Sequence, residues 1–323
     1  MDLIDRKILH SISENARESH NVLARKIRCS REVLDYRLRR LEKEGIISGY
    51  QARLCITNFI HASYILLVQT LGLNKEKLAQ VINKLKINTQ TQYIAKMGGD
   101  YDLLISFTTK SLNQLSSYID FVNSIFGQHK TKTTMLTMVQ EWKDSFKSLF
   151  SENDERNNIV SMPKIEEKID IDEEDKEILL SLGNDATQPS WKISDKLNIT
   201  DVAVRKRISN LEKKKIILGY RTMLKPDKLN LQAFHVFLRT NFENTKQKND
   251  FIDKLLLDKK ITYVMQVVGL HDFLITVFVK DNIELSNYLA SMREQFSDNI
   301  TEANAVPLLE IVYHTQLTKN LLE

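Results

Sequence analysis

The stretch SREVLDYRLRRLEKEGIISGY, residues 30–50, predicts a helix that ends in a tight turn and passes into a strand. Ser30 is a good N-cap because its hydroxyl can accept hydrogen bonds from the free N–H groups of the first helical turn. Gly45 suits the left-handed conformation that commonly ends a helix, and the apolar spacing beyond it changes toward that of a strand. One face of the helix carries leucine at i, i+4 and i+7 and would be buried: Leu34, Leu38 and Leu41.

The same pattern returns 170 residues further along the chain. Residues 200–220 read TDVAVRKRISNLEKKKIILGY, with Thr200 in the place of Ser30. The offset persists without a gap into the later part of each copy, where residues 269–272 correspond to residues 99–102. An ungapped offset over this length indicates a tandem duplication.

The length of 323 residues allows two or more domains, and each half is long enough to bury a sizeable core. The formal net charge of +4 is too small to identify a partner, so the distribution of charge matters more. Residues 1–54 hold twelve Lys and Arg against eight Asp and Glu, whereas the equivalent residues 171–224 hold ten against nine. The two copies are therefore not expected to hold an acidic partner equally well.

The two cysteines, Cys29 and Cys55, form no Cys-x-x-Cys pair. This usage suits a reducing compartment and argues against a disulfide framework or a structural zinc site. The chain begins with a charged amphipathic segment instead of a signal peptide, and no apolar run approaches the roughly 18 residues of a membrane helix. We therefore expect a soluble, cytoplasmic protein that has no membrane partner.

Helical spacing predicts two short helices before the one that follows Ser30, at about residues 2–14 and 21–27. A turn of about three residues separates the last two helices, which is typical of the helix-turn-helix plan. In that plan the third helix presents its N-terminal turns to base edges of DNA, while flanking Lys and Arg contact phosphates. The second copy repeats the three helices near residues 173–182, 192–197 and 200–214.

The remainder of each copy predicts the element order βαββαβ, in the first copy at residues 61–70, 75–87, 92–97, 102–108, 111–126 and 131–142. This order is typical of a ferredoxin-like domain, a four-stranded antiparallel sheet with two helices on one face. The predicted fold class is therefore α+β, with two repeats of a winged helix-turn-helix domain followed by a ferredoxin-like domain. The expected boundaries are 1–50, 51–146, a polar linker at 147–170, 171–220 and 221–323.

Five motifs occur together in the first copy: Asp5-Arg6-Lys7-Ile8-Leu9, Leu23-Ala24-x-x-Ile27, Arg37-Leu38-Arg39-Arg40-Leu41-Glu42, Gly45-Ile46-Ile47-x-Gly49-Tyr50 and Gly98-Gly99-Asp100-Tyr101-Asp102. In this combination the chain resembles the leucine-responsive (Lrp/AsnC) family of bacterial and archaeal transcription regulators. The βαββαβ part is similar to that family's regulation-of-amino-acid-metabolism domain. The resemblance covers nearly the whole chain, twice.

The resemblance implies a DNA-binding transcription regulator that assembles through its sheets and responds to a small effector such as an amino acid. Ordinary members are chains of about half this length that pair with one another. A tandem chain is expected either to form homo-oligomers through its sheets or to fold as an intramolecular pseudo-dimer. A pseudo-dimer would present two linked, non-identical readers to DNA half-sites that need not be palindromic.

Polar and basic side chains of the two third helices are the candidate contacts to double-stranded DNA: Ser30, Arg31, Arg37, Arg39 and Arg40 in the first copy, and Thr200, Arg205, Lys206, Arg207 and Lys213 in the second. The alternative for such basic residues is a solvated helix face. Arg37 and its equivalent Arg207 lie near the buried edge, so a structural ion pair with a carboxylate of the first helix is equally favoured. Asp201 suits the helix dipole but would repel a phosphate.

The glycine-rich turn and its second copy are the candidate effector sites: Gly98, Gly99, Asp100, Tyr101 and Asp102, with Gly269, His271 and Asp272. A carboxylate is the natural partner for the ammonium of an amino acid. The alternative is a tight turn in which Gly99 supplies the backbone conformation and Asp102 bonds to it. The second copy lacks an equivalent of Asp100, so any effector site is expected in the first half or at a composite interface.

The family pattern is broken where glycine commonly precedes the recognition helix, because Arg28 and Asn198 stand there instead. Asn adopts the left-handed conformation more readily than Arg does. Lys215 also replaces the helix-ending Gly45 in the second copy.

The seven histidines show no metal-ligand spacing, and no nucleotide-binding or hydrolase fingerprint is present, so neither a metal nor a cofactor is expected. His61, His235 and His314 are expected to be packed in strands. The alternative to a non-enzymatic regulator is an enzyme on the same scaffold, since sirohaem decarboxylases use a similar two-part arrangement. A third interpretation is a sensor or assembly protein whose second helix-turn-helix is degenerate.

Overall fold

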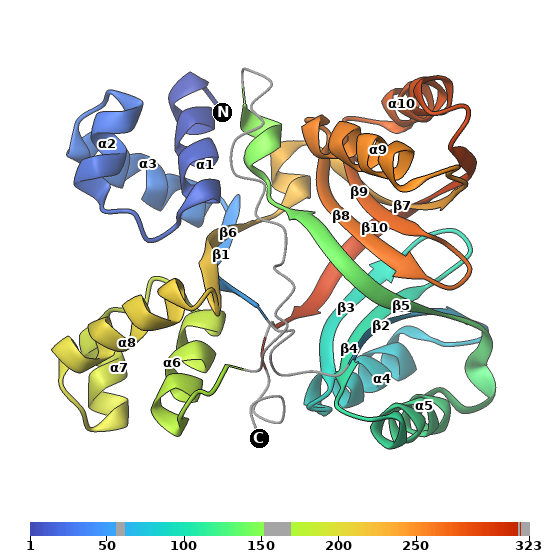
Figure 1. Cartoon of the computed structure of the whole chain (residues 1–323), viewed down its shortest axis with the longest axis horizontal. Coiled ribbons are helices and arrows are strands. Elements are labelled where there is room, and N and C mark those ends of the chain that lie inside the picture. The colour runs from blue at the N-terminus through green and yellow to red at the C-terminus, as the bar shows by residue number, and fades with distance from the viewer. Residues whose placement is uncertain (56–61, 152–168, 316, 318–323) are drawn as a thin grey trace.

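The computed structural model describes residues 1–55, 62–151, 169–315 and 317 (Figure 1). The strand position expected for His61 and most of the expected linker lie outside the described residues. Two helical domains lie side by side in Figure 1, and a strand-rich body lies beside both of them.

The first half runs through α1 (Leu3–Glu14), α2 (His20–Ile27), α3 (Arg31–Lys43), β1 (Ile47–Leu54), β2 (Ala62–Thr70), α4 (Lys75–Ile87), β3 (Thr91–Met97), β4 (Leu103–Thr109), α5 (Leu112–Phe126) and β5 (Lys130–Asp144). The second half repeats this order as α6 (Glu173–Asn184), α7 (Ser190–Leu197), α8 (Asp201–Lys213), β6 (Ile217–Leu224), β7 (Gln232–Thr240), α9 (Thr245–Leu257), β8 (Ile261–Val268), β9 (Phe273–Val279), α10 (Asn282–Gln295) and β10 (Ile300–His314). The two halves therefore share the α+β order that the duplication predicts.

Local sequence accounts for the ends of both recognition helices. The hydroxyl of Ser30 accepts from the backbone N–H of Val33 at 3.3 Å, and the hydroxyl of Thr200 accepts from that of Ala203 at 3.2 Å. Each hydroxyl satisfies one of the N–H groups that a helix start leaves without a backbone partner. Arg28 takes the left-handed conformation in the turn before α3, with φ of 63°.

The helix-ending turn differs between the copies in its backbone strain. Lys215 has φ of 59°, whereas its equivalent Gly45 has φ of 73°. A left-handed conformation costs an L-residue roughly 1–2 kcal/mol, and glycine avoids this strain. Glycine also gives the unfolded chain more conformational freedom, which offsets part of the stabilisation. We expect Lys215→Gly to raise the free energy of unfolding by about 0.5–1 kcal/mol, as measured by urea denaturation.

Gly45→Lys is the matched control for that prediction, because a Cβ at Gly45 meets no heavy atom within 4 Å. We expect Gly45→Lys to destabilise the chain by a similar amount. Two changes of the same sign would contradict the assignment of strain to the backbone at these positions.

A two-stranded ribbon joins the helical domains. Strands β1 and β6 pair in antiparallel orientation, with Tyr50 opposite Thr222. Each strand also completes the hydrophobic core of the opposite helical domain, since Leu224 packs with the α1–α3 core and Leu54 packs with the α6–α8 core. The helical domains are thus held to each other by backbone hydrogen bonds and by exchanged core residues.

The eight remaining strands form one closed barrel in the order β10-β3-β4-β2-β5-β8-β9-β7. The two long strands close it, because β5 pairs with β8 of the second half and β10 pairs with β3 of the first. Closure leaves the sheets without free edges, and in Figure 1 the helices α4, α5, α9 and α10 cover the outside. The halves therefore pair within one chain, as the pseudo-dimer alternative predicts.

Apolar residues of both sheets fill the barrel interior and include Ile65, Leu67, Leu136, Phe237, Met265 and Leu274. Separate cores lie between each sheet and its own pair of helices. Among the described residues, no helix is long and apolar enough to cross a membrane.

Candidate nucleic-acid interface and ligand sites

The outer face of α3 presents both basic and apolar side chains to solvent. Arg31 and Arg39 are exposed, and between them Tyr36 keeps 67% of its surface exposed. Arg31 Nε lies 3.6 Å from the carboxylate of Asp35, one helical turn further on. Such an exposed pair is weak, so it leaves the Arg31 guanidinium available to another anion.

Arg37 and Arg40 instead point back toward the start of α1. Arg37 Nη1 lies 2.5 Å from Asp2 Oδ2 and 2.9 Å from Asp5 Oδ1, and Arg40 Nη2 lies 2.6 Å from Asp5 Oδ2. Asp5 is 1% exposed and needs these charge-assisted contacts to remain ionised. The structural ion pair considered for Arg37 is therefore present, and Arg40 shares it.

This cluster makes the stability of the first helical domain depend on pH in the acidic range. The hydrogen bond from Arg37 holds the pKa of Asp2 at about 2, below its usual 3.8. Because the folded value is the lower one, the contribution is present above about pH 4 and is lost as the pH falls toward 2. We expect the melting temperature of Arg37→Gln to lie below wild type at pH 5 and to converge with it by pH 2. A constant difference across this range would contradict the ion pair as the cause.

The second copy repeats the ion pair but carries its exposed basic side chains at other positions of the helix. Arg207 Nη1 lies 2.7 Å from Asp172 and 2.9 Å from Asp175, and its other terminal nitrogen pairs with Glu174. The remaining candidates sit on the exposed part of α8: Arg205, Lys206 and Lys213. Arg205 Nη2 lies 2.7 Å from the Asp201 carboxylate. Three basic positions of α3 become non-basic in α8, since Arg31, Arg39 and Arg40 correspond to Asp201, Ser209 and Asn210.

The turn at residues 98–102 joins β3 to β4. Asp102 Oδ2 accepts from the backbone N–H and the hydroxyl of Thr70, at 2.6 and 2.9 Å, which fixes the turn. The buried Tyr101 shares a 2.8 Å hydrogen bond with Thr134, and the backbone N–H of Gly98 donates to Pro307 of β10. Asp100 is exposed, so within this turn it is the carboxylate open to a ligand.

The equivalent turn of the second copy is more enclosed. Asp272 Oδ2 accepts from the backbone N–H of Thr240 at 2.7 Å, as Asp102 does in the first copy. Gly269 has φ of 147° and lies against Leu136 of β5. His271 is buried beside Phe237, and burial lowers the pKa of its imidazole. The two copies therefore retain the glycine at 99 and 269 and the aspartate that holds the turn. They differ at the equivalents of Gly98, Asp100 and Tyr101.

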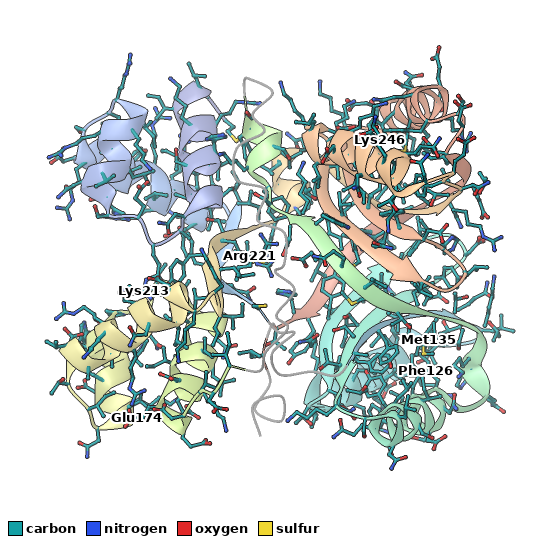
Figure 2. The ribbon with its side chains drawn as sticks, viewed as in Figure 1. Phe126, Met135, Glu174, Lys213, Arg221 and Lys246 are labelled. Carbon is teal, nitrogen blue, oxygen red and sulfur yellow. The ribbon has the colours of Figure 1, made fainter. Side chains whose placement is uncertain are left out.

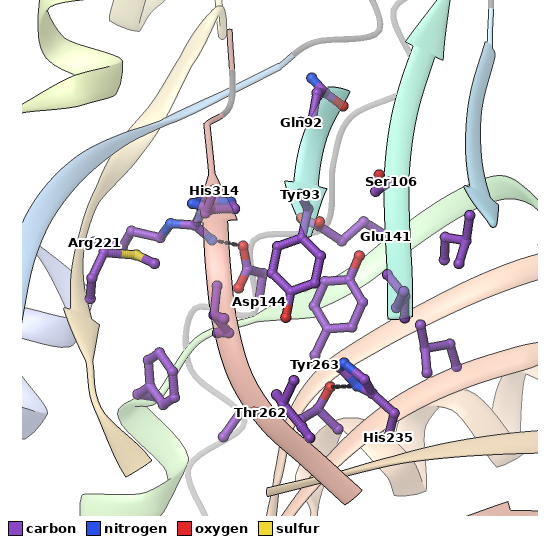
Figure 3. Close-up of a pocket in the computed structure, with 18 of the residues that line it drawn as sticks. Gln92, Tyr93, Ser106, Glu141, Asp144, Arg221, His235, Thr262, Tyr263 and His314 are labelled. Atoms are coloured by element: carbon purple, nitrogen blue, oxygen red, sulfur yellow. Dashed lines mark hydrogen bonds and ion pairs between the residues drawn. The ribbon is translucent and has the colours of Figure 1, made fainter. Parts of the chain in front are cut away.

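A cavity of about 210 Å³ opens at the barrel end that faces the ribbon (Figure 3). It lies at the opposite end of the β3–β4 hairpin from the Gly98–Asp102 turn, because Tyr93 near the start of β3 and Ser106 near the end of β4 line it. Residues from both sheets and from the ribbon surround it, including Leu54, Ile65, Tyr93, Met223, Tyr263, Leu274 and His314.

Charged pairs at this cavity tie the ribbon to β5. Arg221 of β6 pairs with Asp144, and its Nη2 lies 3.1 Å from His314 Nε2. Arg53 of β1 pairs with Glu141 at 2.7 Å. Figure 2 places Arg221 between the helical domains and the barrel. Each strand of the ribbon therefore contacts the barrel through one arginine, and both arginines pair with carboxylates of β5.

Of the cavity residues, the sequence patterns single out only His235 and His314, and those as histidines packed in strands. Tyr93 and Tyr263 carry one signal, since they are identical residues at the 170-residue offset on predicted strands. His235 and His314 lie in β7 and β10 and contribute to the cavity wall. Neither the pairing of Arg53 with Glu141 nor that of Arg221 with Asp144 has a local sequence pattern.

Comparison with known proteins gives consistent results. A family model described as winged helix-turn-helix DNA-binding matches residues 1–48. The HTH-type transcriptional regulator LrpA of Pyrococcus horikoshii is 30% identical over 143 residues, which cover 43% of this chain and 97% of LrpA. An uncharacterised HTH-type transcriptional regulator of Pyrococcus furiosus is 28% identical over 144 residues, which cover 44% of this chain and 95% of the relative.

Solved structures of one protein resemble the whole chain. The crystal structure of the siroheme decarboxylase NirDL superposes with a TM-score of 0.62 and 12% sequence identity, covering 98% of this chain and 94% of the other. At this identity the likeness shows the shared fold of two joined repeats.

Proposed function

Because this chain belongs to the Lrp/AsnC family of transcription regulators, we propose that its two helix-turn-helix units act as one composite reader of a single DNA site. The chain is a DNA-binding transcription regulator of this family. The observation that carries the proposal is the β1–β6 ribbon, which joins both recognition helices within one molecule. Fixed relative placement of two readers sets the spacing of the half-sites that they can contact together.

The composite reader is proposed to be asymmetric. In a symmetric dimer both recognition helices are identical and favour a palindromic operator. Here the exposed Arg31 and Arg39 of α3 correspond to Asp201 and Ser209 of α8. The exposed Arg205 and Lys206 of α8 in turn correspond to Asp35 and Tyr36 of α3. We infer that the operator has two unlike halves. We also infer that the first unit supplies more of the phosphate attraction, because residues 1–54 hold twelve Lys and Arg against eight Asp and Glu, and residues 171–224 hold ten against nine.

Arg39 provides the direct test of the DNA interface. Each phosphate contact releases about one counterion, so its loss lowers affinity and reduces the slope of log affinity against log salt by roughly one. We expect Arg39→Ala to show both effects on fragments of the gene's own upstream region, measured by fluorescence anisotropy between 50 and 200 mM salt.

Arg293→Ala is the matched control, since Arg293 is an exposed arginine on α10, on the outside of the barrel. This variant is expected to keep wild-type affinity and salt slope. Equal behaviour of the two variants, or absence of DNA binding by wild type at low salt, would contradict the proposed interface.

Copy-specific variants test whether the second helix-turn-helix also contacts DNA. We expect Arg205→Ala with Lys206→Ala to weaken binding less than Arg31→Ala with Arg39→Ala. Restriction of the effect to the α3 pair would instead identify a degenerate second unit that serves sensing or assembly.

We further propose that Asp100 contacts an amino-acid effector. It is the exposed carboxylate of the glycine-rich turn, whereas Asp102 is occupied with Thr70. An amino acid that shifts DNA affinity of wild type but not of Asp100→Asn would support this role. An equal shift in both proteins would remove Asp100 from the effector site.

The enzymatic alternative rests on the fold shared with NirDL. We assign no reaction to this chain, because the cavity at the barrel mouth is about 210 Å³, whereas pockets for drug-sized ligands span roughly 300–1,000 Å³. A tetrapyrrole is larger than such ligands. Stoichiometric binding of sirohaem, detected as a shifted absorbance band that titrates to one per chain, would reverse this conclusion.

A further inference from the structure

The barrel-mouth cavity combines apolar walls with a size suited to a small molecule. Aliphatic and thioether side chains from both sheets and the ribbon form most of the wall, among them Leu54, Ile65, Leu104, Met138, Leu274 and Leu308. An engineered cavity of about 150 Å³ with similar walls holds benzene. A volume of about 210 Å³ therefore accommodates a branched aliphatic or phenyl body with one small polar group.

Two tyrosines from equivalent positions meet in this cavity. Tyr93 of β3 and Tyr263 of β8 lie close together in its centre (Figure 3). Among the described residues neither hydroxyl has a hydrogen-bond partner, and burial raises the pKa of both phenols. Both hydroxyls thus stay neutral and can donate to an acceptor that enters between them.

Further donors at the ribbon side lack acceptors. Arg221 donates from Nη2 to Nε2 of His314, so the neutral imidazole carries its proton on Nδ1. That Nδ1 group and Nε of Arg221 have no partner among the described residues. Desolvation lowers the pKa of His314 to about 3, which keeps the ring neutral. Both N–H groups are buried, so the donors that a ligand in the cavity can reach are the two tyrosine hydroxyls.

The carboxylates at the cavity are already occupied. Glu141 pairs with Arg53, and Asp144 pairs with Arg221. A ligand ammonium group would have to break one of these pairs to find an anionic partner, which is costly in a buried setting. A ligand carboxylate meets the available donors without breaking a pair.

The two halves place different residues at equivalent positions around the cavity, so its polar side chains do not follow the pseudo-two-fold symmetry. Under the 170-residue offset, His235 corresponds to Ile65, and Asp144 corresponds to His314. A symmetric dimer would carry each group twice at such an axis. The fused chain instead provides one polar end and suits one ligand in one orientation.

We propose that this cavity binds one small apolar carboxylic acid without an ammonium group, held between the hydroxyls of Tyr93 and Tyr263. Its chemical class is a branched aliphatic or phenyl-substituted monocarboxylate. The site is separate from the turn that contains Asp100, and its ligand differs from an amino acid by the missing ammonium group.

Calorimetric titration of the full-length chain with 4-methylpentanoate and with L-leucine tests the site, because the two molecules differ by the ammonium group alone. We expect one molecule of 4-methylpentanoate per chain and at least tenfold weaker binding of leucine at this site. We expect Tyr93→Phe and Tyr263→Phe each to weaken the carboxylate by about tenfold, the effect of one lost hydrogen bond of about 1.4 kcal/mol.

Tyr64→Phe is the matched control, because Tyr64 is a buried tyrosine of β2 that packs in the outer core of the first sheet. It is expected to leave the affinity unchanged. Ser106→Leu fills the cavity from its wall and should abolish binding of 4-methylpentanoate. The same variant should bind DNA with wild-type affinity, which would show that its fold is retained. Failure of 4-methylpentanoate to bind wild type, wild-type affinity in the Tyr→Phe variants, or loss of binding in Asp100→Asn would overturn the proposal.

Effects of the ligand on DNA rest on the proposed function. Arg221 and Met223 of the ribbon line the cavity, so its occupancy acts on the element that joins the two readers. We expect 4-methylpentanoate to shift DNA affinity severalfold in wild type and not in Ser106→Leu. Calorimetry without DNA separates failure of the site from failure of the regulator assignment.

Discussion

Glu141→Ala is expected to lower the free energy of unfolding by about 3–5 kcal/mol, the usual result of removing one partner of a buried ion pair. The side chains of Arg53 and Glu141 are 9% and 11% exposed, and they meet at 2.7 Å. Without Glu141 the guanidinium of Arg53 stays buried without a compensating charge. Equilibrium denaturation with urea at neutral pH measures the loss.

Two variants isolate the cause of that loss. Arg53→Met combined with Glu141→Leu removes both charges and should recover most of the stability, because apolar pairs of similar volume replace buried ion pairs at little cost. Glu310→Ala removes a partner of Lys96 in a pair that is 36% and 55% exposed, and it should change stability by less than about 1 kcal/mol. A double variant no more stable than Glu141→Ala would point to lost packing instead of a stranded charge.

Gly269→Ala is expected to destabilise the chain by about 2–4 kcal/mol. A Cβ at this position would lie 2.9 Å from Leu136 Cδ2 and 3.0 Å from the backbone oxygen of Met135. Relief of that contact requires β5 to move away from the turn, and overpacking of this kind costs roughly 1–3 kcal/mol. The φ of 147° adds strain of a similar size, because L-residues rarely adopt it. Denaturation monitored by circular dichroism measures the total.

Gly99→Ala separates strain from contact between the halves. Gly99 has φ of 76°, but a Cβ there meets no heavy atom within 4 Å. We expect a loss of about 1 kcal/mol from its backbone conformation alone. Equal losses at Gly99 and Gly269 would show that the approach of Gly269 to β5 has little energetic weight.

The element order followed from the sequence because its signals are local. Helical spacing such as Leu34, Leu38 and Leu41, and caps such as Ser30, act within a few residues and persist in the folded chain. The duplication repeats most of these patterns at an offset of 170 residues. The pairing of the halves was different, since β5 presents the same alternation whether β8 comes from its own chain or from another.

The candidate sites show the same difference between local signals, which the sequence carries, and contacts between distant residues, which it does not. The basic residues of α3 were recognisable, yet whether Arg37 faced DNA or a carboxylate depended on how α1 packs across it. The cavity was beyond sequence reasoning, because Tyr93 and Tyr263 become neighbours only when the barrel closes. Contacts between residues 88 or more positions apart, such as Arg53 with Glu141, leave no periodic trace.

Because one chain carries both helix-turn-helix units, DNA binding should depend on protein concentration differently from that of a dimer of separate chains. When two separate chains must pair before they bind, the paired fraction falls on dilution, and operator occupancy rises steeply with protein concentration. In this chain the β1–β6 ribbon and the barrel seams are intramolecular, so dilution does not separate the readers. If one chain occupies both halves of the operator proposed above, occupancy follows a simple saturation curve in protein concentration instead of the steeper curve of a pairing reaction.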